Sequence, residues 1–198
     1  MDDPALDPPL RVDWLAVDAL RDGRPGRLGL TSLPGKHGPS MRYPGRVYRR
    51  DLDRDLVTLY DAGVRHLMLL VDDDELARWG DPTIVARAAE LGVTIERRPL
   101  ADGTAPGTPG EMDAMLSALS AARVAGDVAV ACMGGVGRTG MVAACALVDA
   151  GWSAEAAIER VRAVRHPTAV ETNEQVMFVN SYEGHVAERR ERSAKVSP

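Results

Sequence analysis

The sequence predicts an α/β fold, a three-layer sandwich in which helices flank a mainly parallel central sheet. Apolar stretches typical of buried strands alternate with stretches of helical periodicity along the chain. An apolar run ends at Cys132, and three glycines then lead into a helical segment, which is the order of a binding site at a strand end. The length of 198 residues suits one domain with a sizeable core.

Composition excludes several classes of protein. Hydrophobic residues make up 45% and charged residues 27% of the chain, as in an ordinary globular protein. The 24 basic and 29 acidic residues leave a net charge of −5, which argues against nucleic acid or an anionic membrane as partner. All basic residues except Lys36 and Lys195 are arginine, and with the abundant alanine and glycine this favours a GC-rich bacterial source.

Location and domain organisation also follow from the sequence. The first ten residues are acidic and proline-rich, unlike a signal peptide, and no apolar run is long enough to cross a membrane. Two cysteines do not make a disulfide framework, so we expect a cytoplasmic, reduced monomer. Residues 1–26 are expected to be an N-terminal tail and entry segment, 27–186 the functional domain, and 187–198 a polar C-terminal tail without apolar surface to pack.

The first half of the domain is expected to alternate between strands and helices. Its elements are a strand over 27–33, a Pro34-Gly35 turn with a polar loop to Arg46, a helix over 51–62, a buried strand over 67–71, a helix opened by Asp81-Pro82 and running to Gly92, and a strand over 93–98.

The second half begins with a loop over 99–110, rich in glycine and proline, which is expected to be mobile. It ends in a capping box of Thr108 and Glu111, and the next helix places Met112 and Met115 in the core. Four elements follow: a strand over 127–132, an apolar helix after Arg138, a helix over 153–165 and a helix that begins at Thr172. Gln175 completes a second capping box at the start of the last helix.

The segment from Cys132 to Gly140 reads Cys-Met-Gly-Gly-Val-Gly-Arg-Thr-Gly. Gly134, Gly135 and Gly137 allow consecutive backbone N–H groups to turn inward around one point. The helix that follows adds its unpaired N–H groups and the positive end of its dipole. Arg138 supplies a planar fork for two phosphate oxygens. The loop therefore predicts a cup for a tetrahedral dianion, with Cys132 at its base as a thiolate.

This Cys-x5-Arg-Thr-Gly pattern resembles the signature loop of the cysteine-dependent protein tyrosine and dual-specificity phosphatases. The longer run over 132–145, and the Gly-Leu-x-x-Leu-Pro-Gly segment over 29–35, are most similar to the kinase-associated phosphatase group, the cyclin-dependent kinase inhibitor 3-like enzymes. One position departs from the pattern: Ala131 stands where these phosphatases usually carry histidine, so one contributor to loop rigidity and thiolate stability is missing.

The resemblance implies phosphoryl transfer in two steps, without a metal or an organic cofactor. Cys132 would attack phosphorus, and Arg138 with the amides of the loop would hold the equatorial oxygens. The phosphate-binding positions are Met133, Gly134, Gly135, Val136, Gly137 and Arg138. Thr139 would donate its hydroxyl to the departing sulfur. Asp102, in an Ala-Asp-Gly context 30 residues before Cys132, is expected to act as general acid and then base, the alternative being that it caps a turn.

Several other residues have two interpretations. For Cys132 the alternative to the nucleophile is a small buried hydrophobe, whereas Cys145 is expected in the core, with a redox role left open. Gln175 resembles a water-positioning glutamine, but the cap explains it equally well. At most one of Arg97 and Arg98 is expected to approach the substrate, and His166 is a weak candidate to replace the histidine missing at 131.

Other functions fit less well. A ParA-type ATPase would need lysine in place of Arg138, and rhodanese loops are one residue shorter. Low-molecular-weight phosphatases place the loop before the acid. The non-enzymatic alternative is a phosphatase fold that binds phosphoprotein without turnover. The expected substrates are phosphotyrosine, with or without phosphoserine and phosphothreonine, in proteins or small phosphomonoesters; the absence of lysine at the variable loop positions argues against phosphoinositides.

Overall fold

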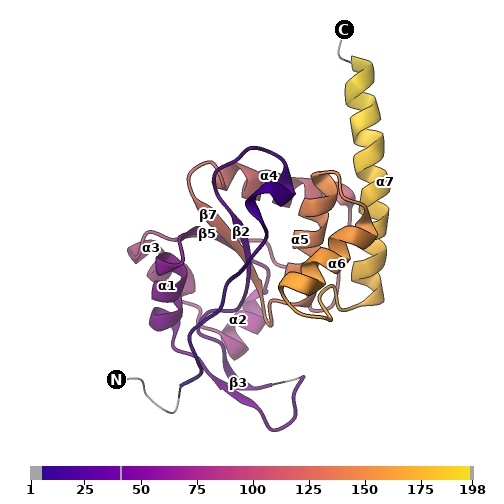
Figure 1. The fold of residues 1–198 in the computed structure, drawn as a ribbon. Helices are drawn as coiled ribbons and strands as arrows, with labels where there is room; N and C mark the ends of the chain where they lie inside the picture. Colours follow the sequence, from indigo (N-terminus) through magenta and orange to yellow (C-terminus); the bar gives the residue numbers. More distant parts are fainter. Residues whose placement is uncertain (1–5, 41, 197–198) are drawn as a thin grey trace.

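A five-stranded sheet forms the middle layer of the molecule (Figure 1). The computed structural model describes residues 6–40 and 42–196. The strands lie in the order β1-β2-β7-β5-β6, and β2, β7, β5 and β6 run parallel while β1 is antiparallel to β2. Their bounds are Asp13–Trp14 for β1, Leu28–Ser32 for β2, Val64–Leu69 for β5, Thr94–Arg97 for β6 and Asp127–Cys132 for β7. The prediction of a mainly parallel sheet is confirmed, and β7, which leads to Cys132, is its central strand.

Helices cover both faces of the sheet, which confirms the three layers. On one face lie α1 (Leu52–Asp61), α2 (Asp73–Trp79) and α3 (Ile84–Glu90), and on the other η1 (Val17–Leu20), α4 (Pro109–Ala122), α5 (Gly137–Asp149), α6 (Ala154–Val164) and α7 (Asn173–Val196) (Figure 1). Side chains of β7 alternate between the two cores: Val128, Val130 and Cys132 pack on the α5 side, and Ala129 and Ala131 on the α1 side. The two-residue period of the strand therefore sends Cys132 toward α5.

One helix start and one capping box differ from the sequence prediction. Helix α3 begins at Ile84 instead of following Asp81 directly, because the Asp81 carboxylate accepts hydrogen bonds from both the backbone and the hydroxyl of Thr83 and holds a turn there. At α4, Thr108 accepts from the backbone of Glu111 as expected. The Glu111 carboxylate, however, accepts from the backbone N–H of Gly107 and so closes only half of the capping box.

Several short elements were not predicted. Strand β1 and helix η1 lie in the expected tail, where Leu15 and Leu20 are buried in the core; the part of that prediction that falls on residues 1–5 lies outside the described residues. The expected loop up to Arg46 contains a hairpin of β3 (His37–Pro39) and β4 (Val47–Arg49). Helix α2 was missed altogether. Strand β5 also begins three residues before the predicted strand at 67.

The expected polar C-terminal tail is helical up to Val196 and continues α7. The helix extends there because Arg189 pairs with Asp113 of α4 and Asp149 of α5, so charged contacts replace the missing apolar surface. Across the described ranges, no helix has the length and apolar character needed to cross a membrane.

The amino end of β7 is fixed by one ion pair. The Asp127 carboxylate accepts from the Arg27 backbone at 2.6 Å, and from its Nε and Nη2 at 3.0 and 2.6 Å. Arg27 also donates to the carbonyl of Ala62 at 3.1 Å, which ties β2, β7 and the end of α1 together. Burial raises the pKa of Asp127, but the hydrogen bonds and charge of Arg27 outweigh burial, and the net effect lowers that pKa.

We expect Asp127→Asn to lower the free energy of unfolding at pH 7 by about 1–3 kcal/mol, because the Arg27 guanidinium loses its charged partner. The lowered carboxyl pKa stabilises the fold above the ordinary Asp pKa, and this contribution disappears as the pH falls through the folded-state value. The difference in unfolding free energy between variant and wild type should therefore become smaller at acidic pH. Urea unfolding at neutral and acidic pH measures it, and an equal deficit at both would contradict the assignment.

Candidate active site

The loop between β7 and α5 has its backbone donors free and its carbonyls occupied. In the part of the chain that the structure describes, the backbone N–H groups of residues 133–136 have no acceptor. The carbonyls of Gly134 and Gly135 accept from Arg165 at 3.2 and 2.8 Å, and that of Val136 accepts from the backbone of Gly140. Helix α5 also starts without a side-chain cap. The loop is therefore arranged to offer its N–H groups to an anion.

Close packing requires glycine at one position of the loop and leaves little room at another. Gly135 has φ +67°, and a Cβ there would lie 2.2 Å from the carbonyl oxygen of Thr31. A Cβ on Gly137 would lie 2.6 Å from a carboxylate oxygen of Glu171. The loop is thus held between the end of β2 and the segment that precedes α7.

Arg138 is fixed at the start of α5 by carboxylates from two other segments. Its side chain is 1% exposed, and Nη1 and Nη2 donate to the Glu75 carboxylate at 2.6 and 2.7 Å. Nη1 also donates to the carbonyl of Leu100 at 2.8 Å, and Nη2 pairs with Asp102 at 2.8 Å. Nε is buried without a partner among the described residues. The guanidinium is thus oriented by Glu75 on one edge and keeps donors on the other edge for a ligand.

Electrostatics keep Arg138 charged in spite of its burial. Burial disfavours the cation, but the hydrogen bonds that Arg138 donates to Glu75 and the negative charges of Cys132, Glu75 and Asp102 outweigh it and raise the pKa of Arg138. Cys132 ends β7 and Arg138 lies in the first turn of α5, so the two residues flank the same loop. Their joint action on a phosphoryl group stays a prediction.

Glu75 is a site residue that the sequence reasoning missed. It lies in the first turn of α2, where Asp72 caps the helix and the two side chains form a complete capping box. The Asp-x-x-Glu spacing directly after the buried strand was the available signal. Nothing local in the sequence indicates that the Glu75 side chain also reaches Arg138.

Asp102 lies at the mouth of the cup on a loop that α7 holds. Its side chain is 74% exposed, and its carboxylate contacts Arg138. The next residues are anchored by hydrogen bonds from Thr172 to the carbonyl of Gly103 at 2.8 Å and from Gln175 to that of Thr104 at 3.3 Å. The loop expected to be mobile is therefore tied to the start of α7. The contact with Arg138 supports a site role over the alternative of a turn cap.

Cys132, Thr139 and Cys145 are all buried. Cys132 is 3% exposed at the end of β7, and the Thr139 hydroxyl has no hydrogen-bond partner among the described residues. Its donation to the sulfur thus stays a prediction. Both cysteines are free, and burial raises the pKa of the Cys145 thiol, as expected for a core residue.

Gln175 completes the predicted cap of α7, because its side-chain oxygen accepts from the backbone of Glu171 and its backbone donates to Thr172. His166 bonds to Thr168 near the surface and does not reach the loop. The neighbouring Arg165 does reach the loop. It donates to the two loop carbonyls and also pairs with Asp13 at 2.6 Å. Arg165 thus supports the loop from the α6 side.

Arg97 and Arg98 bond away from the cup. Arg97 donates to the carbonyl of Val71 and to Asp73, and Arg98 to Glu96. In the described ranges no group of three or more His, Cys, Asp or Glu side chains is placed to hold a metal ion.

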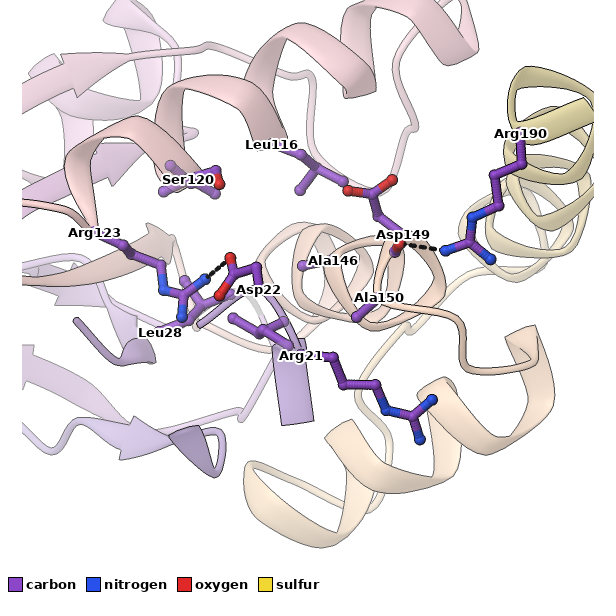
Figure 2. A pocket seen from close by; sticks show the side chains of 12 residues that line it. Arg21, Asp22, Leu28, Leu116, Ser120, Arg123, Ala146, Asp149, Ala150 and Arg190 are labelled. Carbon is purple, nitrogen blue, oxygen red and sulfur yellow. Dashed lines mark hydrogen bonds and ion pairs between the residues drawn. The ribbon is translucent and has the colours of Figure 1, made fainter. Parts of the chain in front are cut away.

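A cavity of about 260 Å³ lies at the opposite end of α5 and is separate from the cup (Figure 2). Arg123 and Asp22 are paired across one side of it, and Arg190 donates to the backbone of Asp149 on the other. Arg123 and Asp149 lie at the carboxyl ends of α4 and α5, Asp22 follows η1, and Arg190 lies in the carboxyl half of α7, whereas the cup uses the start of α5. The cavity therefore takes no part in the site at Cys132.

Fold and site together define a protein of the dual-specificity phosphatase superfamily. The family model described as cyclin-dependent kinase inhibitor 3 (CDKN3) matches residues 2–158, and the chain belongs to this family. Human cyclin-dependent kinase inhibitor 3 is 25% identical over 195 residues, 96% of this chain and 88% of the human protein. The rat protein of the same name is 24% identical over 181 residues, 90% and 81% of the two chains. These relatives are mammalian, and a bacterial source stays a prediction.

Solved structures show the same fold. A crystal structure of kinase associated phosphatase, with its catalytic-site cysteine replaced by serine, has a TM-score of 0.78 at 24% identity and covers 91% of this chain and 98% of its own. The active form of Tk-PTP has a TM-score of 0.64 at 27% identity and covers 82% and 93%.

We expect Glu75→Gln to lower the free energy of unfolding by about 3 kcal/mol, because it leaves the buried Arg138 without its main counter-charge. Anion affinity should fall as well, since the guanidinium loses its fixed orientation. Denaturant unfolding and calorimetric titration with sulfate measure the two effects. Glu90→Gln is the matched control: its side chain is 70% exposed, so its unfolding free energy should stay close to that of wild type. Equal effects of the two variants would contradict the role of Glu75.

Proposed function

We propose that the chain hydrolyses phosphomonoesters of phosphoproteins through a cysteinyl-phosphate intermediate. The observation that carries this proposal is a buried Arg138, oriented by Glu75, next to a loop whose backbone N–H groups have no acceptor among the described residues. These groups match the needs of a phosphoryl transition state, which requires positioning and charge stabilisation around one phosphorus atom.

In the first step the Cys132 thiolate attacks phosphorus while the bond from phosphorus to the ester oxygen breaks. The loop amides and Arg138 hold the three equatorial oxygens, and the protonated Asp102 carboxyl gives its proton to the departing oxygen. In the second step water attacks the cysteinyl-phosphate, the Asp102 carboxylate takes the proton, and the thiolate leaves with inorganic phosphate as the product. Thr139 is assigned to the sulfur as it leaves, and the cycle uses no metal or organic cofactor.

The substrate class rests on the family. Phosphotyrosine in a protein is the primary candidate, with phosphoserine and phosphothreonine as further substrates, and small phosphomonoesters serve as test compounds. A reducing compartment such as the cytoplasm suits the thiolate, since an oxidised Cys132 could not attack phosphorus.

A second candidate is a module that binds phosphoprotein without turnover. Ala131 is the observation that favours it, because the imidazole of related loops is absent. Against it stands the complete set of nucleophile, guanidinium and acid in one site.

We expect Cys132→Ser to lower turnover of an aryl phosphate by roughly a thousandfold or more, because serine is a far weaker nucleophile in this setting. Sulfate binding should persist, since Arg138 and the amides remain. Steady-state kinetics and calorimetry check both. The matched control, Cys145→Ala, alters a core cysteine and should keep turnover close to wild type. Wild-type protein that binds sulfate but releases no phosphate would favour the binding module instead.

We expect Asp102→Asn to slow turnover by roughly 10²–10⁴-fold with an alkyl phosphate, because the poor leaving group then departs unprotonated. A nitrophenyl ester, whose leaving group needs less assistance, should lose much less. The ratio of the two rates is the measurement, and Asp61→Asn, at an exposed position of α1, is the control. An unchanged ratio would remove Asp102 from proton transfer.

A further inference from the structure

Lys36 lies between β2 and β3 at the edge of the sheet that carries the cup. Ser32, the last residue of β2, pairs in register with Cys132, and Lys36 follows four residues later. The turn is fixed from two sides: the backbone of Gly35 donates to Asp55 of α1 at 3.0 Å, and the carbonyl of Lys36 accepts from the backbone of Arg50 at 3.0 Å. The strand register and this anchored turn place the lysine beyond the end of the sheet at which Cys132 lies.

The Lys36 side chain is largely buried, and its ammonium has no acceptor on the protein. The residue is only 8% exposed, and Nζ lies 3.8 Å from the centre of the Tyr48 ring. In the described part of the chain Nζ makes neither a hydrogen bond nor an ion pair, so the ring is its only polar contact there. An ammonium has three donors, and a lysine that is largely removed from water gains from an anionic partner. The Lys36 donors are therefore free for a ligand.

The charges around Lys36 point to an anion over Cys132. Burial lowers the pKa of Lys36 to about 8, and the negative charge of Cys132 opposes this shift. Arg46 and Arg50 lower the same pKa further, and Asp7 raises it. The neighbouring Asp55 is already paired with Arg50 at 2.8 Å. Of the charges that act on this pKa, that of Cys132 has the largest effect, whereas Asp7 is paired with Arg46.

We propose that Lys36 is a substrate-binding residue of this site, whose ammonium donates to an oxygen of the phosphoryl group held over Cys132 and stabilises the adjacent thiolate. It supplies a cation where Ala131 provides no imidazole, and it comes from β2 and not from the loop. Tyr48 holds the ammonium in place by a cation–π contact until the substrate arrives. This inference rests on the proposed function, because it assumes that the cup takes a phosphoryl group.

The test is sulfate binding by calorimetry, because sulfate stays a dianion across the pH range used. All arms carry Cys132→Ser, so that no thiol titrates. The parent should lose affinity as the pH rises through the range in which Lys36 becomes neutral, which burial shifts below the ordinary lysine pKa. Lys36→Met should bind about tenfold more weakly at pH 7 and lack this step. Lys36→Arg should restore affinity and remove the step, since arginine stays charged.

The matched control is Lys195→Met, because Lys195 is the other lysine of the chain. It is exposed near the end of α7, which extends away from the β3 hairpin in Figure 1, and its loss should leave the whole curve unchanged. A lysine that only packs on Tyr48 would change stability and leave sulfate affinity and its pH step as in the parent, and that outcome overturns the proposal. Absence of turnover in wild-type protein would instead reject the phosphatase function, so the two failures are distinguishable.

A second measurement needs no variant and remains decisive where Lys36→Met does not fold. Wild-type protein is acetylated with acetic anhydride with and without saturating sulfate, and mass spectrometry reports the two lysines separately. Sulfate should protect Lys36 severalfold and leave Lys195 unaffected. Equal labelling of Lys36 with and without sulfate would overturn the proposal.

Discussion

The buried ion pair between Arg138 and Glu75 is the constraint on which the site depends. It joins the first turn of α5 to the first turn of α2, and the same guanidinium reaches the carbonyl of Leu100 after β6. A charge in this position would be very costly alone, so the carboxylate is required by the arginine. Arg138 thus joins the segments that follow β7, β5 and β6, which are parallel strands of the sheet. The position of the phosphate loop is therefore set by the sheet and not by the loop alone.

The carbonyls and the backbone N–H groups of the loop have different surroundings. Arg165 donates to two carbonyls of the loop, while the N–H groups of residues 133–136 have no acceptor within 6–40 and 42–196. Free backbone donors are uncommon in folded proteins because they lose the hydration of the unfolded chain. Their persistence here is consistent with a ligand that replaces water. Arg165, paired with Asp13 of the antiparallel edge strand, gives the loop a rigid support that the alanine at 131 does not.

Much of the site could be predicted because its parts are close in sequence. Cys132, the glycines and Arg138 form one segment whose geometry follows from a strand end and a helix start, and Asp102 lies in a recognisable loop. Glu75 could not be predicted, since it reaches Arg138 only through the order of the parallel strands. The role proposed for Lys36 was missed for the same reason: among the positions 133–138 of the loop there is no lysine, and Lys36 comes from the segment after β2.

Elements of the fold with a clear hydrophobic period were predicted, and elements that are short or depend on distant contacts were missed. Strands and long amphipathic helices follow their periodicity, and β7 has the predicted bounds. Helix α2 and the β3–β4 hairpin are too short to show a period, and the charged end of α7 is helical only because Arg189 meets acids on α4 and α5.

The contact between Asp102 and Arg138 has a consequence for timing. In the structure this carboxylate neutralises part of the guanidinium charge. A phosphoryl group would compete for the same edge of Arg138 and, on the mechanism proposed above, displace the carboxylate, which must take up a proton before it can act as the acid. Entry of the anion and release of Asp102 would then be one exchange of partners on a single arginine.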